Sequence, residues 1–173
     1  MALHGPVLTP PPRLDHPSRD DLASLLAGRR PWPLTVSGIG GRPGWAAGPL
    51  VGGNLSLLCH LLGTPWLPPF KGAILLLEDT NEAPYRLDRL LTQLELAGVF
   101  DQVAGVAVGS LGVEDAATGE LPSALVWRLV CLKVPLVMGL PFGHGSANRL
   151  LPLGAQAEIN GQAGTLAVGL DLA

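Results

Sequence analysis

The segment KGAILLLEDTNEAPYRLDRLLTQLELAG, residues 71–98, constrains the fold more than any other part of the chain. It starts with an unbroken apolar run at 73–77, and two acids, Glu78 and Asp79, follow directly. Pro84 then opens a long amphipathic pattern. A short apolar run followed by a turn and a helical pattern predicts a buried strand, an acidic loop and a helix. Because ligands gather at the carboxyl ends of parallel strands, the two acids are candidate site residues.

Two further apolar runs, at 103–108 and 134–140, predict buried strands, and a helical pattern at 122–132 lies between them. The order strand, helix, strand, helix, strand predicts two βαβ units. Such units build a parallel three-stranded core with right-handed crossovers.

The remaining strands predict a second sheet. Short strands are expected at 34–36 and 45–51, joined by the loop GIGGRPG, which lacks the pattern of a phosphate-binding loop. Asn54 is expected to cap a helix, and Asn160-Gly161 is a signal for a two-residue hairpin. The fold class is therefore α/β, a three-layer β/β/α sandwich: a small parallel sheet covered by helices, and a second, mainly antiparallel sheet.

The first 17 residues are rich in proline, which predicts an extended surface arm outside the core. Ser18, followed by Asp21, is expected to cap a short helix that stops at Gly28.

Composition excludes several classes of protein. Among 173 residues, 47% are hydrophobic and 14% charged, which provides for a core, and the net charge of -3 gives no support to nucleic-acid or anionic-membrane binding. No apolar run approaches the roughly 20 residues of a membrane-spanning helix, and the N-terminus lacks the order of a signal peptide. Cys59 and Cys131 are expected to be reduced thiols, as in the cytoplasm.

The topology places two ionisable groups at equivalent positions. Glu78 follows the first parallel strand, and His144 follows the third, in a turn flanked by glycines. Both side chains should therefore emerge at one rim of the sheet. A carboxylate that holds one imidazole nitrogen leaves the other free as a general base, which is two-thirds of a Ser-His-acid triad.

Other interpretations of these residues remain open. Glu78 and Asp79 could cap the following helix, and His144 could be a turn residue bonded to backbone. A metal site is also possible, although no HxxxH or CxxC spacing is present.

Nearby polar residues have simpler roles. Arg86 and Arg89 are expected to pair with acids, although an arginine near the rim could bind a substrate carboxylate. Cys59 and His60 are adjacent in a predicted helix and are expected to be a core cysteine beside a partly buried histidine, not a nucleophile pair. No serine lies in a GxSxG-like turn, and Ser146 is too close to His144 in sequence to be a convincing nucleophile.

Several motifs together resemble the LD-carboxypeptidase family of serine peptidases, which includes muramoyl-tetrapeptide carboxypeptidases and microcin-C immunity peptidases. They are HGP at 4–6, GPLVGGNLSLLCHLLGTPW at 48–66, LLLEDTNEAPYRLDRLLTQL at 75–94 and PFGHGSANRLLPLG at 141–154. The resemblance covers nearly the whole chain, in order.

The resemblance implies a C-terminal domain of the swivelling β/β/α type, with Glu78 as the triad acid and His144 as the general base. It also implies that the N-terminal domain, which carries the nucleophilic serine, is absent. Residues 1–33 would then be an inter-domain linker arm with a short helix, and 34–173 the C-terminal domain. The chain would be a cloned domain, the product of a truncated gene or half of a split enzyme.

The implied activity of the intact enzyme is removal of a C-terminal D-amino acid from murein tetrapeptides, in the cytoplasm and without a cofactor. We expect this chain alone to be inactive. Its expected partners are the peptide and the missing domain, and an apolar face left open could make it a homodimer. The alternatives are a non-catalytic interaction module, or a related peptidase acting on a peptide-nucleotide antibiotic.

Overall fold

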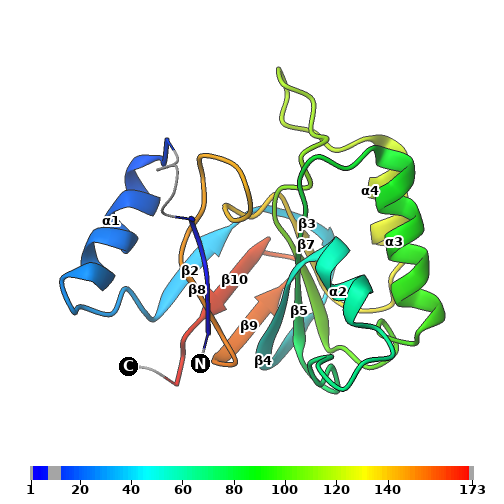
Figure 1. Ribbon diagram of the computed structural model, residues 1–173, viewed down its shortest axis with the longest axis horizontal. Helices are drawn as coiled ribbons and strands as arrows, with labels where there is room; N and C mark the ends of the chain where they lie inside the picture. Colours follow the sequence, from blue (N-terminus) through cyan, green and yellow to red (C-terminus); the bar gives the residue numbers. More distant parts are fainter. Residues whose placement is uncertain (1, 8–12, 172–173) are drawn as a thin grey trace.

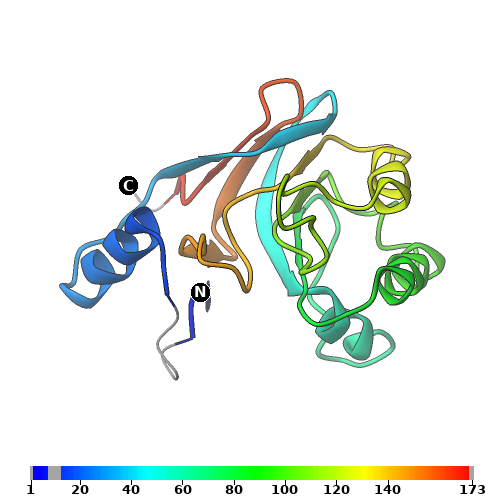
Figure 2. The same ribbon diagram turned by 90° about the horizontal axis from the view of Figure 1, so that it is seen from above.

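The computed structural model describes residues 2–7 and 13–171 and shows a three-layer β/β/α sandwich (Figures 1 and 2). Helices α2, α3 and α4 form one outer layer, a parallel sheet lies in the middle, and mainly antiparallel strands form the other side. The predicted fold class is confirmed. No helix of the described part of the chain is long and apolar enough to cross a membrane.

The parallel layer contains four strands rather than the three expected. Its strands are the second half of β4 (Trp45–Asn54), β5 (Ile74–Glu78), β6 (Gly105–Val108) and β7 (Leu136–Met138). The connections between them are α2 (Leu55–Leu61), α3 (Pro84–Leu96) and α4 (Ser123–Val130), and all three cover the same face. The unexpected member is β4, because its ten residues are long enough to pair with different strands along its two halves.

Side chains of β5 alternate between two hydrophobic cores, as strand geometry requires. Leu75 and Leu77 pack among the helices, whereas Ile74 and Leu76 pack between the two sheet layers. All four are at most 1% exposed. Burial on both faces explains why this strand is apolar at every position before Glu78.

The antiparallel layer is continuous with the parallel one. The first half of β4 pairs with β9 (Gln156–Asn160), which pairs with β10 (Thr165–Val168), which pairs with β2 (Leu34–Ser37). The expected loop GIGGRPG contains a further strand, β3 (Ile39–Arg42), which pairs with β7 at the far edge. Since only Gly38 separates β2 from β3, the chain itself joins the two edges of the eight-stranded sheet.

The predicted hairpin forms with a longer loop than expected. Residues 161–164 connect β9 to β10, and the side-chain Oδ1 of Asn160 accepts hydrogen bonds from the backbone amides of Gln162 and Ala163. The two-residue prediction was wrong because this side chain organises a four-residue turn instead.

The N-terminal segment is not only an extended arm. Residues Ala2–His4 form β1, which pairs with β8 (Leu151–Leu153) in a small separate sheet. Residues 1 and 8–12 of the predicted arm lie outside the described residues. The division of the chain at residue 33 stays a prediction.

The short helix is confirmed as α1 (His16–Leu26), but its cap is Asp15, whose side chain accepts a hydrogen bond from the Ser18 amide at 2.9 Å. Ser18 is buried, and its hydroxyl accepts from the Asn148 amide at 2.9 Å. Asp21 binds the guanidinium of Arg149 through both oxygens, at 2.5 and 3.1 Å. The residues predicted to start the helix instead dock it on the segment that follows His144.

Candidate active site

Glu78 is the last residue of β5 and lies at the carboxyl edge of the parallel layer. Its side chain is only 2% exposed, and the residue is paired in register with Asn54, the last residue of β4. A carboxylate buried this deeply needs partners that stabilise its charge.

His144 is the first of these partners. It follows β7 in a loop, and its Nδ1 lies 2.6 Å from Oε2 of Glu78. Its side chain is half exposed, and among the described residues the other ring nitrogen has no hydrogen-bond partner. The structure therefore brings the two predicted site residues into direct contact, in agreement with the prediction that both lie at one rim of the parallel sheet. Their catalytic roles stay predictions.

Gly143 makes this contact possible. Its φ is +116°, in a region that side chains rarely adopt, and a Cβ there would lie 3.2 Å from Cβ of Glu78. The loop is held by the buried Asn148, whose Oδ1 accepts from the Gly143 amide at 3.4 Å. The glycine thus lets the backbone pass directly over Glu78.

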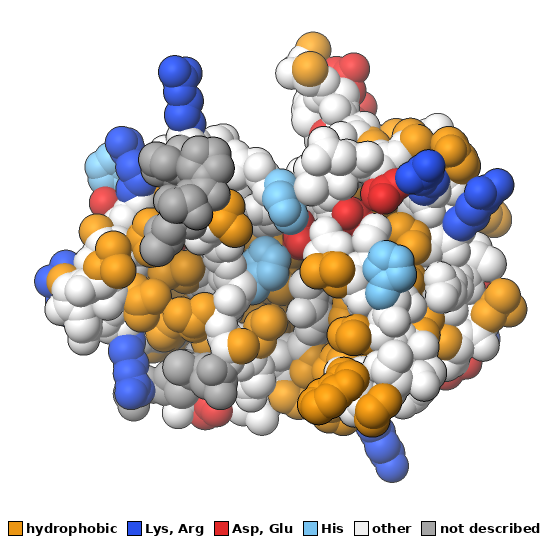
Figure 3. All heavy atoms as spheres, viewed as in Figure 1, with side chains coloured by type: hydrophobic (Ala, Val, Ile, Leu, Met, Phe, Trp, Pro, Cys, Tyr) orange, Lys and Arg blue, Asp and Glu red, His pale blue; other side chains and the backbone are white. Residues whose placement is uncertain are grey.

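His4 is a third member of the cluster. From the sequence it was singled out only as part of the HGP motif and was not predicted to be a site residue. Its Nε2 lies 3.7 Å from Oε1 of Glu78, the oxygen that His144 does not use. Its ring packs edge-to-face on Phe142, with centroids 5.8 Å apart. In the space-filling view an acidic side chain lies between two histidines near the middle of the face (Figure 3).

The electrostatics of Glu78 reflect these neighbours. Burial raises the pKa of its carboxyl group, but the imidazoles of His4 and His144 outweigh burial and hold the pKa below its ordinary value. Glu78 is therefore ionised at neutral pH, the state that can orient an imidazole and stabilise its protonated form.

Asp79 has a different task. It accepts hydrogen bonds from the Ser56 amide and hydroxyl, at 3.0 and 2.8 Å, and from Nδ2 of Asn54 at 3.0 Å. These contacts tie the start of α2 to the end of β5. The alternative interpretation, in which Glu78 and Asp79 cap the following helix, is wrong, because α3 begins after Ala83 without a side-chain cap.

The remaining candidates take structural roles. Arg86 pairs with Glu82 at 3.3 Å, and Arg89 lies over the Tyr85 ring, 5.2 Å from its centroid. Cys59 is buried, and burial together with the charge of Asp79 raises its thiol pKa to about 11. Both cysteines are free thiols.

Within residues 2–7 and 13–171, no group of three or more His, Cys, Asp or Glu side chains is arranged to hold a metal ion.

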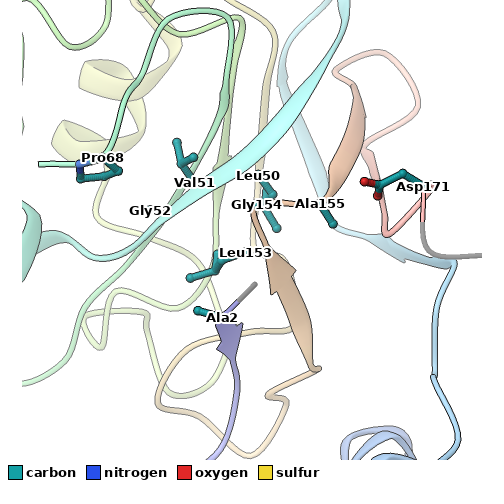
Figure 4. Close-up of a pocket in the computed structure, with 9 residues that line it drawn as sticks. All are labelled: Ala2, Leu50, Val51, Gly52, Pro68, Leu153, Gly154, Ala155 and Asp171. Carbon is teal, nitrogen blue, oxygen red and sulfur yellow. The ribbon is translucent and has the colours of Figure 1, made fainter.

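A pocket of about 400 Å³ lies away from the Glu78 cluster. Val51 and Gly52 of β4, Leu153 of β8 and Ala2 of β1 line it (Figure 4). The charged group at its edge, Asp171, already accepts a hydrogen bond from the Gln156 amide at 2.9 Å. The pocket therefore adds no reactive group to the site.

Comparison with known proteins gives the same picture for fold and family. The profile of the family described as "LD-carboxypeptidase C-terminal domain" matches residues 47–159. The "Putative carboxypeptidase slr1534" of Synechocystis is 44% identical over 172 residues, covering 96% of this chain and 56% of that protein. The "Murein tetrapeptide carboxypeptidase" of Pseudomonas aeruginosa is 34% identical over 174 residues, covering 92% and 56%.

A solved structure agrees with these relatives. The muramoyltetrapeptide carboxypeptidase from Oxalobacter formigenes superposes with a TM-score of 0.78 at 32% identity, covering 96% of this chain and 61% of that one. The chain thus spans little more than half the length of these proteins. With the family profile matched over most of its length, the chain belongs to the LD-carboxypeptidase family, in the part that forms the C-terminal domain.

Proposed function

We propose that this chain supplies the acid and the base of a serine LD-carboxypeptidase. The observation that carries the proposal is the 2.6 Å contact between His144 Nδ1 and the buried carboxylate of Glu78. Glu78 fixes the imidazole with a proton on Nδ1, so that Nε2 is free to accept a proton from a nucleophile. A non-catalytic module on the same scaffold would have no need of a buried, ionised carboxylate held against a half-exposed histidine.

The proposed reaction is acyl transfer in the intact enzyme. The hydroxyl oxygen of a serine attacks the amide carbonyl of the substrate, while Nε2 of His144 takes the hydroxyl proton. His144 then gives this proton to the nitrogen of the leaving amino acid as the C–N bond breaks. A water molecule, deprotonated by His144, attacks the ester that remains. The C–O bond to the serine then breaks, His144 returns the proton to the serine oxygen, and the shortened peptide is released. Glu78 stabilises the imidazolium in both halves of the reaction.

The serine in this proposal comes from polypeptide beyond these 173 residues. No serine hydroxyl of the described residues is hydrogen-bonded to His144. Ser110, which follows β6, bonds instead to Glu114 at 3.3 Å. We therefore expect the isolated chain to lack peptidase activity.

The proposed substrate is a murein tetrapeptide that ends in a D-amino acid with a free carboxyl group, and the proposed compartment is the cytoplasm. The similarity to the murein tetrapeptide carboxypeptidase of Pseudomonas supports the substrate class. The thiol of Cys59, free and buried, fits a reducing compartment.

Reconstitution tests the proposal. The N-terminal part of the Synechocystis relative is fused ahead of this chain, and release of the terminal D-amino acid from a murein tetrapeptide is followed by chromatography. We expect activity in the fusion that is lost in His144→Ala and in a variant without the serine, and strongly reduced in Glu78→Gln. A peptidyl-nucleotide offered in parallel distinguishes a peptidase of the antibiotic-immunity type.

Two results would contradict the proposal. Serine-dependent hydrolysis by the isolated chain would show that the nucleophile lies within it. An active fusion in which His144→Ala changes nothing would remove the dyad from the mechanism. The exposed His16, which lies in α1 and pairs with Asp20, provides the matched control through His16→Ala.

A further inference from the structure

The proposed reaction uses only Glu78 and His144, but the position of His4 is also fixed, through contacts of both its backbone and its ring. It is the last residue of β1, where it pairs in register with Leu151 of β8. Its side chain is 15% exposed, whereas that of His144 is 50% exposed. The strand pairing fixes the backbone of His4, and the edge-to-face contact with Phe142 fixes its ring. A histidine held in this way is unsuited to meet substrate.

The carboxylate of Glu78 lies between two imidazoles and gives one oxygen to each. Oε2 meets Nδ1 of His144 at 2.6 Å, and Oε1 meets Nε2 of His4 at 3.7 Å, an electrostatic contact slightly longer than a direct hydrogen bond. The terminal torsion of a glutamate is broad, so a single contact does not fix the plane of the carboxylate. A second contact on the other oxygen restricts that rotation.

The surroundings of His4 also assign its proton. Its Nδ1 is buried and has no hydrogen-bond partner among the described residues. A neutral imidazole carries one proton. On Nε2 that proton points toward an anionic oxygen, whereas on Nδ1 it would be buried without an acceptor and the Nε2 lone pair would face Glu78. The tautomer protonated on Nε2 is therefore favoured.

We propose that His4 is a positioning residue of the active site: its Nε2–H restrains Oε1 of Glu78 so that Oε2 stays aligned on His144. The catalytic meaning of this role rests on the proposed function, but the restraint itself is a property of this chain. His4 acts through Glu78 and does not touch the substrate. The restraint acts on Glu78 and not on the adjacent acid Asp79, because the Asp79 carboxylate binds Ser56 at the start of α2.

The restraint can be measured by NMR on the full 173-residue chain without any catalysis. His4→Phe keeps an aromatic ring but removes the N–H, and His4→Gln keeps a donor near the position of Nε2. Titration of the Glu78 carboxyl carbon in His4→Phe should show a pKa raised by about one pH unit, because a buried carboxylate loses one of the two imidazoles that stabilise its charge. His4→Gln should return the value toward that of the unmodified chain. The exposed His16 supplies the control, since His16→Phe should leave Glu78 unchanged.

The outcomes separate cleanly. If His4→Phe is folded and Glu78 titrates as in the unmodified chain, the proposal is overturned. If His4→Phe does not fold, the imidazole nitrogen shifts of the unmodified chain decide: a proton on Nε2 of His4 supports the restraint, and a proton on Nδ1 overturns it.

The fused enzyme separates this inference from the proposed function. There His4→Phe should lower kcat with little change in KM, and His4→Gln should restore part of the loss. A fusion without any activity, combined with a shifted Glu78 titration, would refute the proposed function and leave the restraint standing.

Discussion

Replacement of the buried Asp79 by asparagine should lower the free energy of unfolding more than the same replacement of an aspartate on the protein surface. Asp79 is 2% exposed, and each of its oxygens accepts two hydrogen bonds: Oδ1 from Asn54 and Thr80, and Oδ2 from the amide and hydroxyl of Ser56. In Asp79→Asn one oxygen becomes an NH₂ group, which faces two donors and can accept from neither. A hydrogen bond to a charged group contributes about 1.5–3 kcal/mol. With partial relaxation, the loss of two predicts destabilisation by about 3 kcal/mol.

Equilibrium unfolding in urea, followed by far-UV circular dichroism, measures this loss. For a chain of this size, about 3 kcal/mol corresponds to a fall in Tm of roughly 10 °C. Ser56→Ala removes only the hydroxyl bond to the charged carboxylate and should cost about 1.5 kcal/mol, roughly half as much. Asp101→Asn, at an exposed turn, should stay within about 0.5 kcal/mol of the unmodified chain. If Asp79→Asn matched the Asp101 control, our account of how β5 is tied to α2 would be wrong.

Three further predictions concern single side chains. With a thiol-specific reagent at pH 8, the exposed Cys131 should react quickly and Cys59 slowly, because burial raises the Cys59 pKa to about 11 and leaves little thiolate. Asp15→Ala should cost about 1 kcal/mol of stability at neutral pH. Its hydrogen bonds to Ser18 lower the folded-state pKa of Asp15 below 3.8, so this contribution is present above that value and is lost as the pH falls through the lowered pKa. Gly143→Ala should break the contact between Glu78 and His144, since φ is +116°, and the loss of this imidazole should raise the pKa of the Glu78 carboxyl group.

Each of these has a result that would contradict it. Equal reaction rates for the two thiols would show that Cys59 is accessible, and Cys131→Ser identifies the fast one. A destabilisation by Asp15→Ala that persisted at pH 2 would mean that the cap does not depend on the charge. An unchanged Glu78 titration in Gly143→Ala would show that the loop tolerates a side chain over Glu78.

The parallel core and the pairing of Glu78 with His144 could be predicted from the sequence for one physical reason. Strands buried on both faces are apolar at every position, so residues 73–77 stand out, and polar residues after them mark the carboxyl edge. Glu78 and His144 follow parallel strands of one sheet, so both must lie at the same rim. The prediction needed only the order of elements, because right-handed crossovers fix the rest.

Other features depend on contacts that leave no local pattern. β3 carries two glycines because the chain passes close to neighbouring segments there: a Cβ at Gly40 would strike the backbone of Gly161, in the turn after β9, and one at Gly41 the side chain of Leu136 in β7. β1 is three residues long and pairs only with a strand from the far end of the chain. His4 was not predicted for this reason, since its contact with Glu78 depends on the pairing of β1 with β8.

The cap of α1 was misassigned for a related reason. Asp15 and Ser18 both precede helical residues with suitable spacing, and local sequence does not rank them. Tertiary contacts decide, because the Ser18 hydroxyl is occupied by the Asn148 amide and Asp21 is occupied by Arg149.

Two strands near the start of the sequence, β1 and β2, pair with strands from its last part, and this has a consequence for how the protein folds during synthesis. β2 is translated well before its partner β10, and β1 well before its partner β8. Contacts between distant parts of a chain form late and slow the folding of the whole. Until β10 and β8 have been translated, β2 and β1 lack these partners, and unpaired strands invite pairing with other nascent chains. Since His4 is carried by β1, its place beside Glu78 can be fixed only after β8 has been translated.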